Sequence, residues 1–442
     1  MAIIQAPRGT EDVLPAQAEK WVYLENTARD TARLFGFGEI RFPTFEYTEL
    51  FARGVGETTD VVQKEMFSVS KKGSDEKEKS FTLRPEGTAP TVRAVLQHGL
   101  YGGPLPLRLF YLTSCFRGER PQAGRLREFH QFGVELFGAE KPAADVEVIA
   151  LARAVFEKLG VEGLRLEINS IGCPDCRKTY HDALRTYFEA HAESLCETCR
   201  GRLATNPMRI LDCKNPECKQ LAAGAPRVLD YICSDCRAHF EGVQRGLGEL
   251  GIAFTVNPAI VRGLDYYTRT VFEFVDEKQG LTLCGGGRYD GLVQSLGGPQ
   301  LPALGFGMGL ERLLLAMEAQ GCAFPGEENG GVYFAPMGDA AAALAAKLAA
   351  QLREEGFSAE YDLLGRSVKA QMKYADKRGF GYAVVIGDEE LRRGEAALKS
   401  LRGGENRTVK LDGSFTGAVY EAQRADALEN LAGAVEHSEA GQ

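Results

Sequence analysis

The stretch RGLDYYTRTVFEF, residues 262–274, decides the fold because it is a predicted β-strand that carries several charges. From Tyr266 onward nearly every residue is aromatic or β-branched, which is typical of a half-buried strand. Arg262, Asp265 and Glu273 lie in the same stretch, and burial of unpaired charge costs roughly several kcal/mol. The sequence therefore predicts a strand whose charged side chains find partners in an enclosed site.

Glycine-rich segments follow this strand. CGGGRYDGL, residues 284–292, comes after a short connection as the second half of a hairpin, and GFGMGLERLLLAME, residues 305–318, is a glycine-rich strand that leads into a helix. Further strand-like segments are RFPTFEY, FTLRP, LRLFYLTSCFRG, EFHQFGVELFG and AFTVNP. Close hairpins predict a largely antiparallel sheet. Neither glycine cluster matches a phosphate-binding loop or a dinucleotide fingerprint, so ATP, if bound, must be held in another way.

Polar side chains alternate along EFHQFGVELFG, residues 128–138. The strand period of two places Gln131, Gly133 and Glu135 on one face. Because Gly133 has no side chain, we expect a hole between an amide and a carboxylate. Both faces of the strand are apolar enough to be covered, which favours a small-ligand pocket over a solvent-exposed sheet face.

Arginines cluster at the end of the preceding strand and in the loop after it: Arg117, Arg120, Arg125 and Arg127. The planar guanidinium binds phosphate or carboxylate through two hydrogen bonds, so this cluster suits a polyphosphate. A surface ion-pair network with Glu119 and Glu128 is an equal alternative on these residues alone. Glu86 and Thr88 lie beside a tight turn in RPEGTAP, residues 84–90, and indicate little by themselves.

Eight of the 11 cysteines form four close pairs in one segment. The pairs are Cys173 and Cys176, Cys196 and Cys199, Cys213 and Cys218, and Cys233 and Cys236. Paired thiolates are ligands of a tetrahedral structural Zn²⁺, so one or two such ions are favoured over free thiols. A catalytic zinc ion is not expected, because no HExxH pattern occurs and His181, His191 and His239 lack ligand spacing.

Composition is that of an ordinary globular protein with two or more domains. The 442 residues exceed what one hydrophobic core usually organises, and 44% are hydrophobic and 26% charged. No apolar run approaches the roughly 18 residues of a membrane span, and the N-terminus lacks a signal-peptide pattern, so the cytoplasm is the expected location. The net charge of −9 argues against a protein that coats nucleic acid but permits a local basic face.

The sequence pattern changes around CAFPGEENGG, residues 322–331. Pro, Gly and acidic residues indicate a linker there. Beyond it, strand and helix patterns alternate from VYFAP to YAVVIG, which predicts a small α/β domain over 331–427. The tail 428–442 is expected to be flexible.

Several of these motifs together resemble one known family. PRGTEDVLP, IRFPTFE, RPEGT, FRGERPQAGRLREFHQ, RGLDYYTRTVFEF, GGGRYDG and GFGMGLERL follow the order found in histidyl-tRNA synthetases, which are class II aminoacyl-tRNA synthetases. The match spans nearly the whole chain, and residues 262–267 and 285–291 carry its most specific part. The resemblance implies an α+β catalytic domain over 1–325, in which helices flank a six-stranded antiparallel sheet. It also implies a Cys-rich insertion at about 172–240 and a C-terminal α/β anticodon-binding domain.

The resemblance implies a two-step reaction. L-Histidine and ATP, with Mg²⁺, form histidyl-adenylate and pyrophosphate, and the histidyl group then passes to the 3′ end of tRNA(His). Negative charge develops on phosphoryl and carbonyl oxygens, so fixed cations and Mg²⁺ are the main catalytic tools.

Site residues follow from the resemblance position by position. Arg262 and Arg117 would be catalytic, at the α-phosphate and the substrate carboxylate. ATP would contact Arg117, Glu119, Arg125 and Arg312, with Arg120 in the same mobile loop as Arg125. Histidine would contact Glu86, Gly87, Thr88, Arg117, Gln131, Glu135, Arg262, Tyr266, Tyr267 and Tyr289. Among these, Glu86, Thr88 and Gln131 would hold the α-amino group. Glu135 and Tyr267 would take the imidazole, whose N–H donor and acceptor match a carboxylate and a phenol. Arg269 and Glu273 share a strand face and are expected to pair across the sheet, without a catalytic role.

Partners and alternatives complete the hypothesis. Basic residues outnumber acidic ones over 366–410, which suits tRNA phosphates, although a solvated helix face is the alternative. The family's motif around Pro43 implies a homodimer. Two other classes are a regulatory paralogue of ATP phosphoribosyltransferase and a noncatalytic zinc-containing RNA-binding protein. The first typically lacks the C-terminal domain and intact catalytic blocks, and the second leaves the pocket residues unused.

Overall fold

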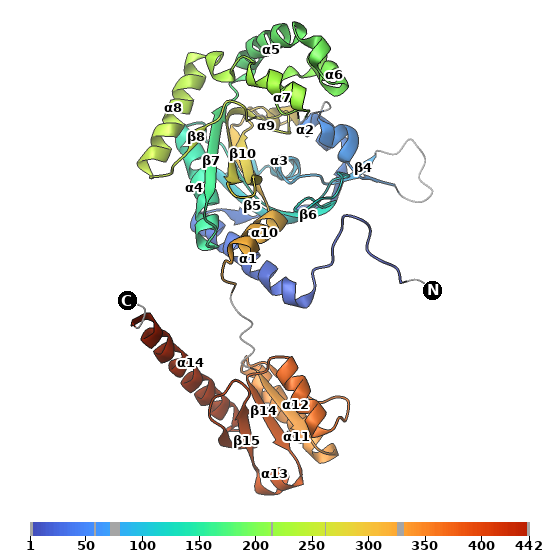
Figure 1. Ribbon diagram of the computed structural model, residues 1–442, viewed down its shortest axis with the longest axis vertical. Coiled ribbons are helices and arrows are strands. Elements are labelled where there is room, and N and C mark those ends of the chain that lie inside the picture. Colours follow the sequence, from blue (N-terminus) through green and yellow to red (C-terminus); the bar gives the residue numbers. More distant parts are fainter. Residues whose placement is uncertain are drawn as a thin grey trace. The chain divides into compact units, whose positions relative to one another are not determined.

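The chain forms two compact units, Met1–Phe324 and Pro325–Gln442, each with its own sheet and core (Figure 1). The computed structural model describes residues 3–56, 59–70, 80–213, 215–260, 262–324 and 331–439, the last eleven of these by their backbone alone. The expected linker falls largely on residues 325–330, which lie outside the described residues. No helix within the described ranges is both long and apolar enough to cross a membrane.

An eight-stranded sheet forms the centre of the first unit, in the order β1-β5-β6-β11-β10-β9-β7-β8. Its strands are β1 (Gly38–Glu39), β5 (Leu107–Phe116), β6 (Glu128–Phe137), β7 (Leu164–Ser170), β8 (Thr255–Val256), β9 (Thr268–Asp276), β10 (Leu281–Arg288) and β11 (Ala303–Gly309). The six strands from β5 to β7 pair antiparallel, whereas β1 and β8 pair parallel with their neighbours. The predicted six-stranded antiparallel sheet is confirmed, and one short strand extends it at each edge.

The predicted strand over 262–274 is shorter than expected. It begins only at Thr268 and pairs with β10 as the predicted hairpin, with Phe272 opposite Gly286. Residues 262–267 form a loop, in which Asp265 N–H donates to the carbonyl oxygen of Val55 at 3.1 Å. This contact joins the backbone at Asp265 to the end of α2, and the chain enters the sheet only at Thr268.

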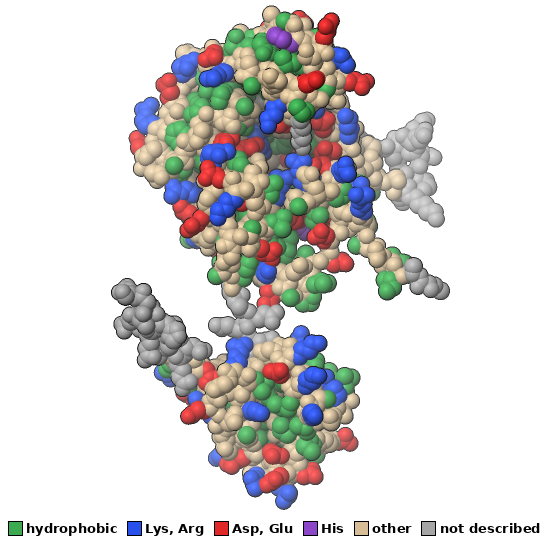
Figure 2. Space-filling model, viewed as in Figure 1, with side chains coloured by type: hydrophobic (Ala, Val, Ile, Leu, Met, Phe, Trp, Pro, Cys, Tyr) green, Lys and Arg blue, Asp and Glu red, His purple; other side chains and the backbone are tan. Residues whose placement is uncertain are grey.

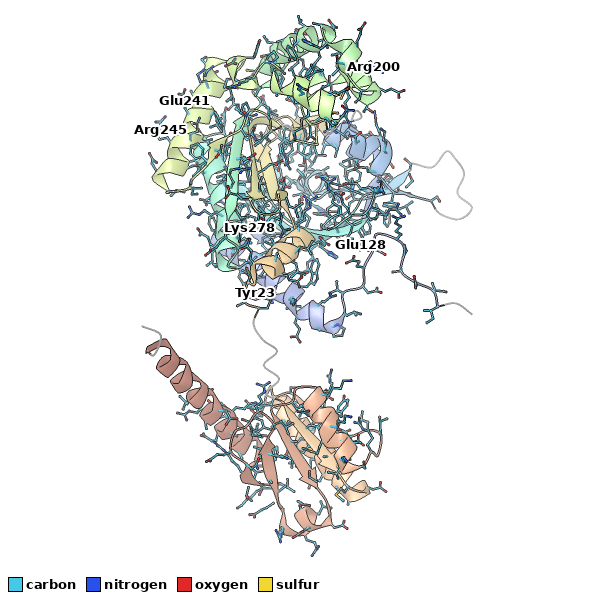
Figure 3. The ribbon with its side chains drawn as sticks, viewed as in Figure 1. Tyr23, Glu128, Arg200, Glu241, Arg245 and Lys278 are labelled. Carbon is cyan, nitrogen blue, oxygen red and sulfur yellow. The ribbon has the colours of Figure 1, made fainter. Side chains whose placement is uncertain are left out.

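Four helices cover one face of this sheet: α1 (Pro15–Leu34), α4 (Pro142–Lys158), α8 (Ser234–Glu249) and α10 (Leu310–Gln320). In α4 the apolar Val148, Leu151, Ala152 and Val155 recur at helical spacing and are buried. Helix α8 has the same character, since Phe240, Val243 and Leu247 are buried while Glu241 and Arg245 lie on its outer surface (Figure 3). The buried Phe132, Val134 and Leu136 of β6 face these helices, which confirms the alternation predicted for this strand. Its polar residues therefore face the other side.

The opposite side of the sheet is bordered by smaller elements. They are the helices α2 (Thr48–Val55), α3 (Thr88–Gln97) and α9 (Leu292–Ser295) and the three-stranded sheet β2 (Phe45–Tyr47), β4 (Phe81–Leu83) and β3 (Ser68–Val69). Buried apolar side chains of α3 and α9 pack on Leu109 and Phe137 of the large sheet. These elements leave the middle of this face uncovered.

The Cys-rich insertion is helical in its described residues and packs around its own core. Its helices before α8 are α5 (Pro174–Glu189), α6 (Glu197–Thr205) and α7 (Pro216–Ala223), with short 3-10 turns at Ala192–Ser194, Pro207–Ile210 and Val228–Asp230. Cys173, Cys196 and Cys233 stand directly before α5, α6 and α8. The first backbone N–H groups of three helices therefore lie beside thiols.

The second unit confirms the predicted α/β alternation. Its elements run β12 (Val332–Pro336), α11 (Asp339–Glu354), β13 (Ala359–Tyr361), α12 (Val368–Lys377), β14 (Tyr382–Ile386), α13 (Asp388–Arg393), β15 (Glu395–Ser400), β16 (Arg407–Lys410) and α14 (Phe415–Glu439). The sheet order is β13-β12-β14-β15-β16, parallel over the first three strands and antiparallel over the rest. Helix α14 reaches Glu439, so backbone helix runs through most of the segment predicted as a tail, whose flexibility stays a prediction.

Candidate active site

A cavity of about 680 Å³ lies on the uncovered face of the large sheet. Figure 2 shows the hollow in the first unit, with acidic and basic side chains at its edges. Its lining includes the predicted residues Glu86, Thr88, Arg117, Glu119, Arg125, Gln131, Arg262, Tyr266, Tyr267 and Arg312. Glu135 and Tyr289 are buried next to it and reach it through Thr88 and Tyr266. Arg120 is exposed and is not among the lining residues.

Glu135 is a buried carboxylate that has no cationic partner among the described residues. Thr88 donates to Oε1 at 2.7 Å, Tyr111 donates to the same oxygen at 3.4 Å, and Tyr289 donates to Oε2. Burial raises the pKa of Glu135 to about 8, although these hydrogen bonds favour the ionised form. An enclosed carboxyl group with this pKa can accept a hydrogen bond from a small polar ligand when it is ionised, and can donate one to it when it is protonated. In the described contacts, Tyr267 lies beside Tyr266 and Arg262 rather than Glu135.

The space beside Gly133 is filled, and the expected hole is therefore a wrong prediction. Tyr111 of β5 lies opposite Gly133 in the register of β5 and β6, and a Cβ atom on Gly133 would overlap its ring. A Cβ atom on Gly87 would also overlap this ring. Gly87 thus has a packing role, and Tyr111 is a site residue that the sequence analysis missed. Its partnership with Gly133 depends on the register of two strands, which the sequence does not show.

Arg262 meets Glu273, which corrects the expected pairing of Arg269 and Glu273. Arg262 Nη1 donates to Glu273 Oε1, and Thr282 donates to Glu273 Oε2 at 3.0 Å. Burial opposes the charged form of Arg262, but Glu273 and Tyr267 together outweigh it through their charges and hydrogen bonds, and the arginine's pKa is raised. A side chain on Gly285 would overlap the guanidinium, so glycine is required where Arg262 crosses β10. Arg269 lies instead near Asp290, with 3.9 Å between Nε and Oδ2.

The remaining arginines gather at another part of the cavity. Arg117 Nε donates to the carbonyl oxygen of Pro85 at 2.9 Å, and Arg125 Nη1 donates to Glu119 at 3.2 Å. Arg312 donates to the carbonyl oxygens of Gly124 at 2.9 Å and Thr282 at 2.8 Å. The pKa of Arg312 is lowered by burial and by the nearby positive charge of Arg125. Three cations that face one cavity and repel one another suit a polyanion.

Glu86 caps helix α3 within the cavity. Its carboxylate accepts from the N–H groups of Thr88 at 2.7 Å and Ala89 at 2.8 Å. Burial raises its pKa despite these two bonds. The carboxylate is therefore fixed in orientation by the helix N-terminus.

The insertion contributes one wall of the cavity, which the sequence analysis did not predict. Arg202 and Arg209 donate to Asp60 Oδ2 at 2.9 Å and 3.2 Å, and all three residues line the cavity. Asn206 also donates to Asp265 at 3.1 Å. Arg202 and Arg209 lie more than 140 positions from Asp60 in sequence, and Asn206 lies 59 positions from Asp265, so no local pattern predicts these contacts.

The eight cysteines form two groups of four, within each of which the ligand atoms lie within 4.8 Å of one another. The first cluster is Cys173, Cys176, Cys233 and Cys236, and the second cluster is Cys196, Cys199, Cys213 and Cys218. Cys233 N–H donates to Cys176 Sγ at 3.0 Å, and Cys196 N–H donates to Cys218 Sγ at 3.2 Å. The backbone N–H of Cys199 lowers the pKa of Cys196, and that of Cys236 lowers the pKa of Cys233, each to about 7, whereas burial raises the pKa of Cys176 and of Cys218. Sets of four neighbouring thiols fit a tetrahedral metal ion.

Family comparisons agree with this architecture. A family model described as histidyl-tRNA synthetase matches residues 9–313, and one described as anticodon binding domain matches residues 331–416. Two curated relatives are named histidine–tRNA ligase. That of Acetivibrio thermocellus is 50% identical over 412 residues, which cover 93% of this chain and 98% of the relative. That of Clostridium perfringens is 51% identical over 410 residues, which cover 92% and 97%.

A solved structure is similar along almost the whole length. It is the apo histidyl-tRNA synthetase of S. aureus, with a TM-score of 0.79 and 39% sequence identity. The match covers 95% of this chain and 100% of that one. With the family model, the relatives and this structure in agreement, the chain belongs to the histidyl-tRNA synthetase family.

Proposed function

We propose that the chain is a histidine–tRNA ligase, which forms histidyl-adenylate from L-histidine and ATP and transfers the histidyl group to the 3′ end of tRNA(His). One arrangement carries the proposal: a buried carboxylate with hydroxyl partners lies next to a cavity that also holds a set of arginines. The first part suits an imidazole and the second a triphosphate. The names of the near-full-length relatives favour this function over the regulatory paralogue and the noncatalytic RNA-binding protein.

Histidine is proposed to bind with its imidazole toward Glu135. An imidazole carries one N–H donor and one acceptor, and Glu135 with its tyrosine neighbours supplies the complementary groups. The α-amino group would lie near Glu86, Thr88 and Gln131, where the carboxylate of Glu86 offers a negative charge. A site that hydrogen-bonds a substrate group rejects analogues that lack it by roughly 10⁴- to 10⁵-fold. Selection of histidine would then need no separate editing reaction.

ATP is proposed to bind across Arg117, Arg125 and Arg312. Arg117 and Arg262 would contact the α-phosphate and the histidine carboxylate, so that the attacking oxygen and the phosphorus are held together. Arg312 would meet the γ-phosphate end, and Glu119 would lie near the adenine. Because Arg262 is fixed by Glu273, its charge is oriented before the substrates arrive. This preorganisation is the chain's proposed contribution to the rate of adenylation.

The described carboxylates fit Mg²⁺ carried by ATP. Protein sites usually supply one or two carboxylates to this ion, and phosphates and water provide the rest. Glu65 and Glu119 both line the cavity, and burial together with the negative charge of Glu119 raises the pKa of Glu65. A cation between them would relieve this repulsion. Bound Mg²⁺ would neutralise charge on the phosphates during transfer.

The second unit is proposed to bind the anticodon stem-loop of tRNA. Lys369, Lys373 and Lys377 recur every four residues on α12 and are all exposed. Leu363 and Leu364, just before this helix, are 78% and 75% exposed. A row of cations for phosphates beside apolar side chains for unstacked bases is typical of a surface that binds single-stranded RNA.

The two cysteine clusters are proposed to bind one structural Zn²⁺ each. Four thiols per group, backbone donors to sulfur and the absence of a histidine from both groups fit closed tetrathiolate sites. Elemental analysis of the purified full-length protein should find two zinc ions per chain. A zinc content near zero after purification with added Zn²⁺ would contradict this part of the proposal.

A homodimer in the cytoplasm completes the proposed function. Phe45 and Tyr47, next to Pro43, are 51% and 48% exposed, and such apolar groups suit a self-association surface. Sedimentation of the full-length protein should give twice the mass of one chain.

Histidine-dependent exchange of ATP and pyrophosphate tests the activity. Exchange with histidine, none with other amino acids, and histidyl transfer to tRNA(His) are the expected results. A regulatory paralogue or an RNA-binding protein would show no exchange, and this outcome would refute the proposal.

A further inference from the structure

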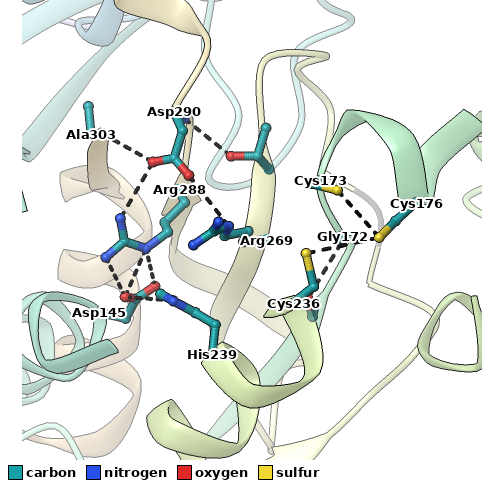
Figure 4. A network of polar contacts seen from close by, with 12 residues as sticks. Asp145, Gly172, Cys173, Cys176, Cys236, His239, Arg269, Arg288, Asp290 and Ala303 are labelled. Carbon is teal, nitrogen blue, oxygen red and sulfur yellow. Dashed lines mark hydrogen bonds and ion pairs between the residues drawn. The ribbon is translucent and has the colours of Figure 1, made fainter. Parts of the chain in front are cut away.

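A network of polar contacts around Asp145 and Arg288 lies beside the first cluster (Figure 4). Arg288, which is fully buried, donates to Asp145 Oδ2 from Nη2 at 2.7 Å and from Nε at 2.9 Å. His239 Nε2 lies 3.1 Å from the same oxygen. Because an ionised carboxylate only accepts hydrogen bonds, His239 must carry a proton on Nε2. Arg288 also donates to the carbonyl oxygens of Ala139 and Lys141, so its side chain has one fixed position between α4 and α8.

The network continues into the pocket through the residues that follow Arg288. Tyr289 is next in the chain and donates its hydroxyl to Glu135. Its backbone N–H donates to the carbonyl oxygen of Ala303 at 2.8 Å, and Asp290 Oδ1 accepts from Ala303 N–H at 3.3 Å. The side chain of Arg288 and the turn at Asp290 thus fix Tyr289 from both sides.

Two routes connect this turn to the first cluster. His239 lies one helical turn after Cys236 in α8, the helix that begins after Cys233. The second route runs through Arg269, whose N–H donates to the carbonyl oxygen of Gly172 at 2.8 Å, directly before Cys173. Arg269 has a φ of 51°, which a residue other than glycine keeps only when its surroundings enforce it. Its guanidinium lies near Asp290, so both routes end at residues 288–290.

We infer that a metal ion in the first cluster is a positioning element for histidine recognition. By joining the start of α8 to the turn at Gly172, it would fix His239 and Arg269, and through Arg288 and Asp290 it would hold Tyr289 against Glu135. The inference rests on the proposed function, because it assigns the Glu135 pocket to histidine. It goes beyond a structural zinc site because it predicts that the first cluster, and not the second, controls the affinity for histidine but not that for ATP.

The second cluster serves as the internal comparison. Its helix α6 carries Arg202, which lines the cavity and, in the described contacts, meets Asp60 and Arg209 rather than any member of the network. ATP contacts are proposed on Arg117, Arg125 and Arg312, which come from the β5–β6 connection and α10. Loss of the first cluster should therefore weaken histidine binding while ATP binding is kept.

Variants of His239 test the network without touching a metal ligand. In full-length zinc-loaded protein, His239→Leu should raise the KM for histidine about tenfold or more, with the KM for ATP and kcat within about twofold. Tenfold corresponds to ~1.4 kcal/mol. His239→Gln should restore most of the affinity, because its amide can donate to Asp145. His191→Leu is the matched control, since His191 is an exposed histidine of the same insertion whose ring contacts only Tyr187 in the described contacts.

Specific outcomes would overturn the network. They are an unchanged KM for histidine in His239→Leu, an equal rise in both KM values, or no rescue by His239→Gln. If His239→Leu does not fold, the KM for histidine is compared between His239→Gln and His239→Ser. Serine is smaller and cannot span the distance to Asp145, so only His239→Ser should show the raised KM. If wild-type protein lacks histidine-dependent exchange, the proposed function itself fails, which separates that failure from a failure of the network.

Cysteine variants test the metal. Cys233→Ser and Cys196→Ser replace the residue before α8 and the residue before α6, one in each cluster. Each variant should lose one of two zinc ions by elemental analysis. Calorimetric titration with histidine should show at least about fivefold weaker binding for Cys233→Ser than for Cys196→Ser. Two zinc ions kept in Cys233→Ser, or equal histidine affinities in the two variants, would refute the inference.

Discussion

Substitution of Glu135 by glutamine should remove a pH dependence from the stability of the first unit. Burial raises the pKa of Glu135 from its ordinary 4.5 to about 8, even with hydrogen bonds from Thr88 and Tyr289. The folded pKa is thus above the unfolded one, so the folded protein binds this proton more tightly. Below about pH 4.5 Glu135 is protonated in both the folded and the unfolded protein, so its contribution to the free energy of unfolding is fully present and does not change with pH. Between about pH 4.5 and 8 the unfolded chain ionises first, so the free energy of unfolding falls as pH rises.

The size of the effect follows from the pKa difference. One proton taken up by only the folded state changes the free energy of unfolding by about 1.4 kcal/mol per pH unit. From pH 5.5 to 7.5 the loss for Glu135 is about 2.5 kcal/mol, a little below two full units, because ionisation of the folded protein begins near the upper end. Glutamine has no proton to exchange, so Glu135→Gln should gain about 2.5 kcal/mol relative to the wild type across this range.

The single tryptophan makes the measurement specific to this unit. Trp21 packs against the core of the large sheet, and its fluorescence should report the unfolding of the first unit. Urea denaturation at pH 5.5, 6.5 and 7.5 gives the free energy difference between variant and wild type, in which all other titrating groups cancel. Glu241→Gln, an exposed position on α8, is the matched control and should give a constant difference. A constant difference for Glu135→Gln would mean that Glu135 is ionised in the folded protein, and would refute the reasoning.

Three further substitutions test other contacts of the cavity. Arg262→His should lower histidine-dependent exchange by about 10²-fold or more, since a donor to developing negative charge is lost, and near-normal exchange would contradict its role. Gly285→Ala should lower exchange while stability changes by less than about 1 kcal/mol, because the new methyl group overlaps only the terminal guanidinium atoms of Arg262 and no backbone. Gly133→Ala should instead destabilise the first unit by about 1–3 kcal/mol in urea denaturation, because it overlaps the buried ring of Tyr111. If Gly133→Ala is as stable as the wild type, the packing account of Tyr111 is wrong.

Much of the fold could be predicted from local patterns. Alternation along β6 assigned its two faces, and the short connection before β10 indicated the hairpin with β9. The spacing of the cysteines indicated tetrathiolate groups, but the division into clusters depends on how α5 and α8 approach each other. Sequence spacing alone did not fix that division.

The sequence predicted which residues line the site more fully than it predicted which of them contact one another. Arg262 and Glu273 were both recognised as charges in need of partners, yet their mutual pairing depends on the loop that leaves the sheet at Thr268. Tyr111 was not predicted as a site residue, because it lies in a strand rich in apolar and aromatic residues. In such a strand a core residue and a site residue give the same hydrophobic pattern. Arg202 and Asp60 are joined only by tertiary packing of the insertion, which no periodicity encodes.

The glycines beneath the cavity have a consequence for drug resistance. Where β10 and β11 line the cavity, Gly285, Gly307 and Gly309 present only backbone atoms to it. An inhibitor that packs on this floor would touch atoms shared by every amino acid, so resistance could not arise by trimming a side chain. Adding one would displace a neighbouring side chain, because a Cβ atom at Gly285 would overlap Arg262 and one at Gly307 would overlap Gln131. Mutations that push the inhibitor away would therefore also displace the side chains proposed to hold the substrates.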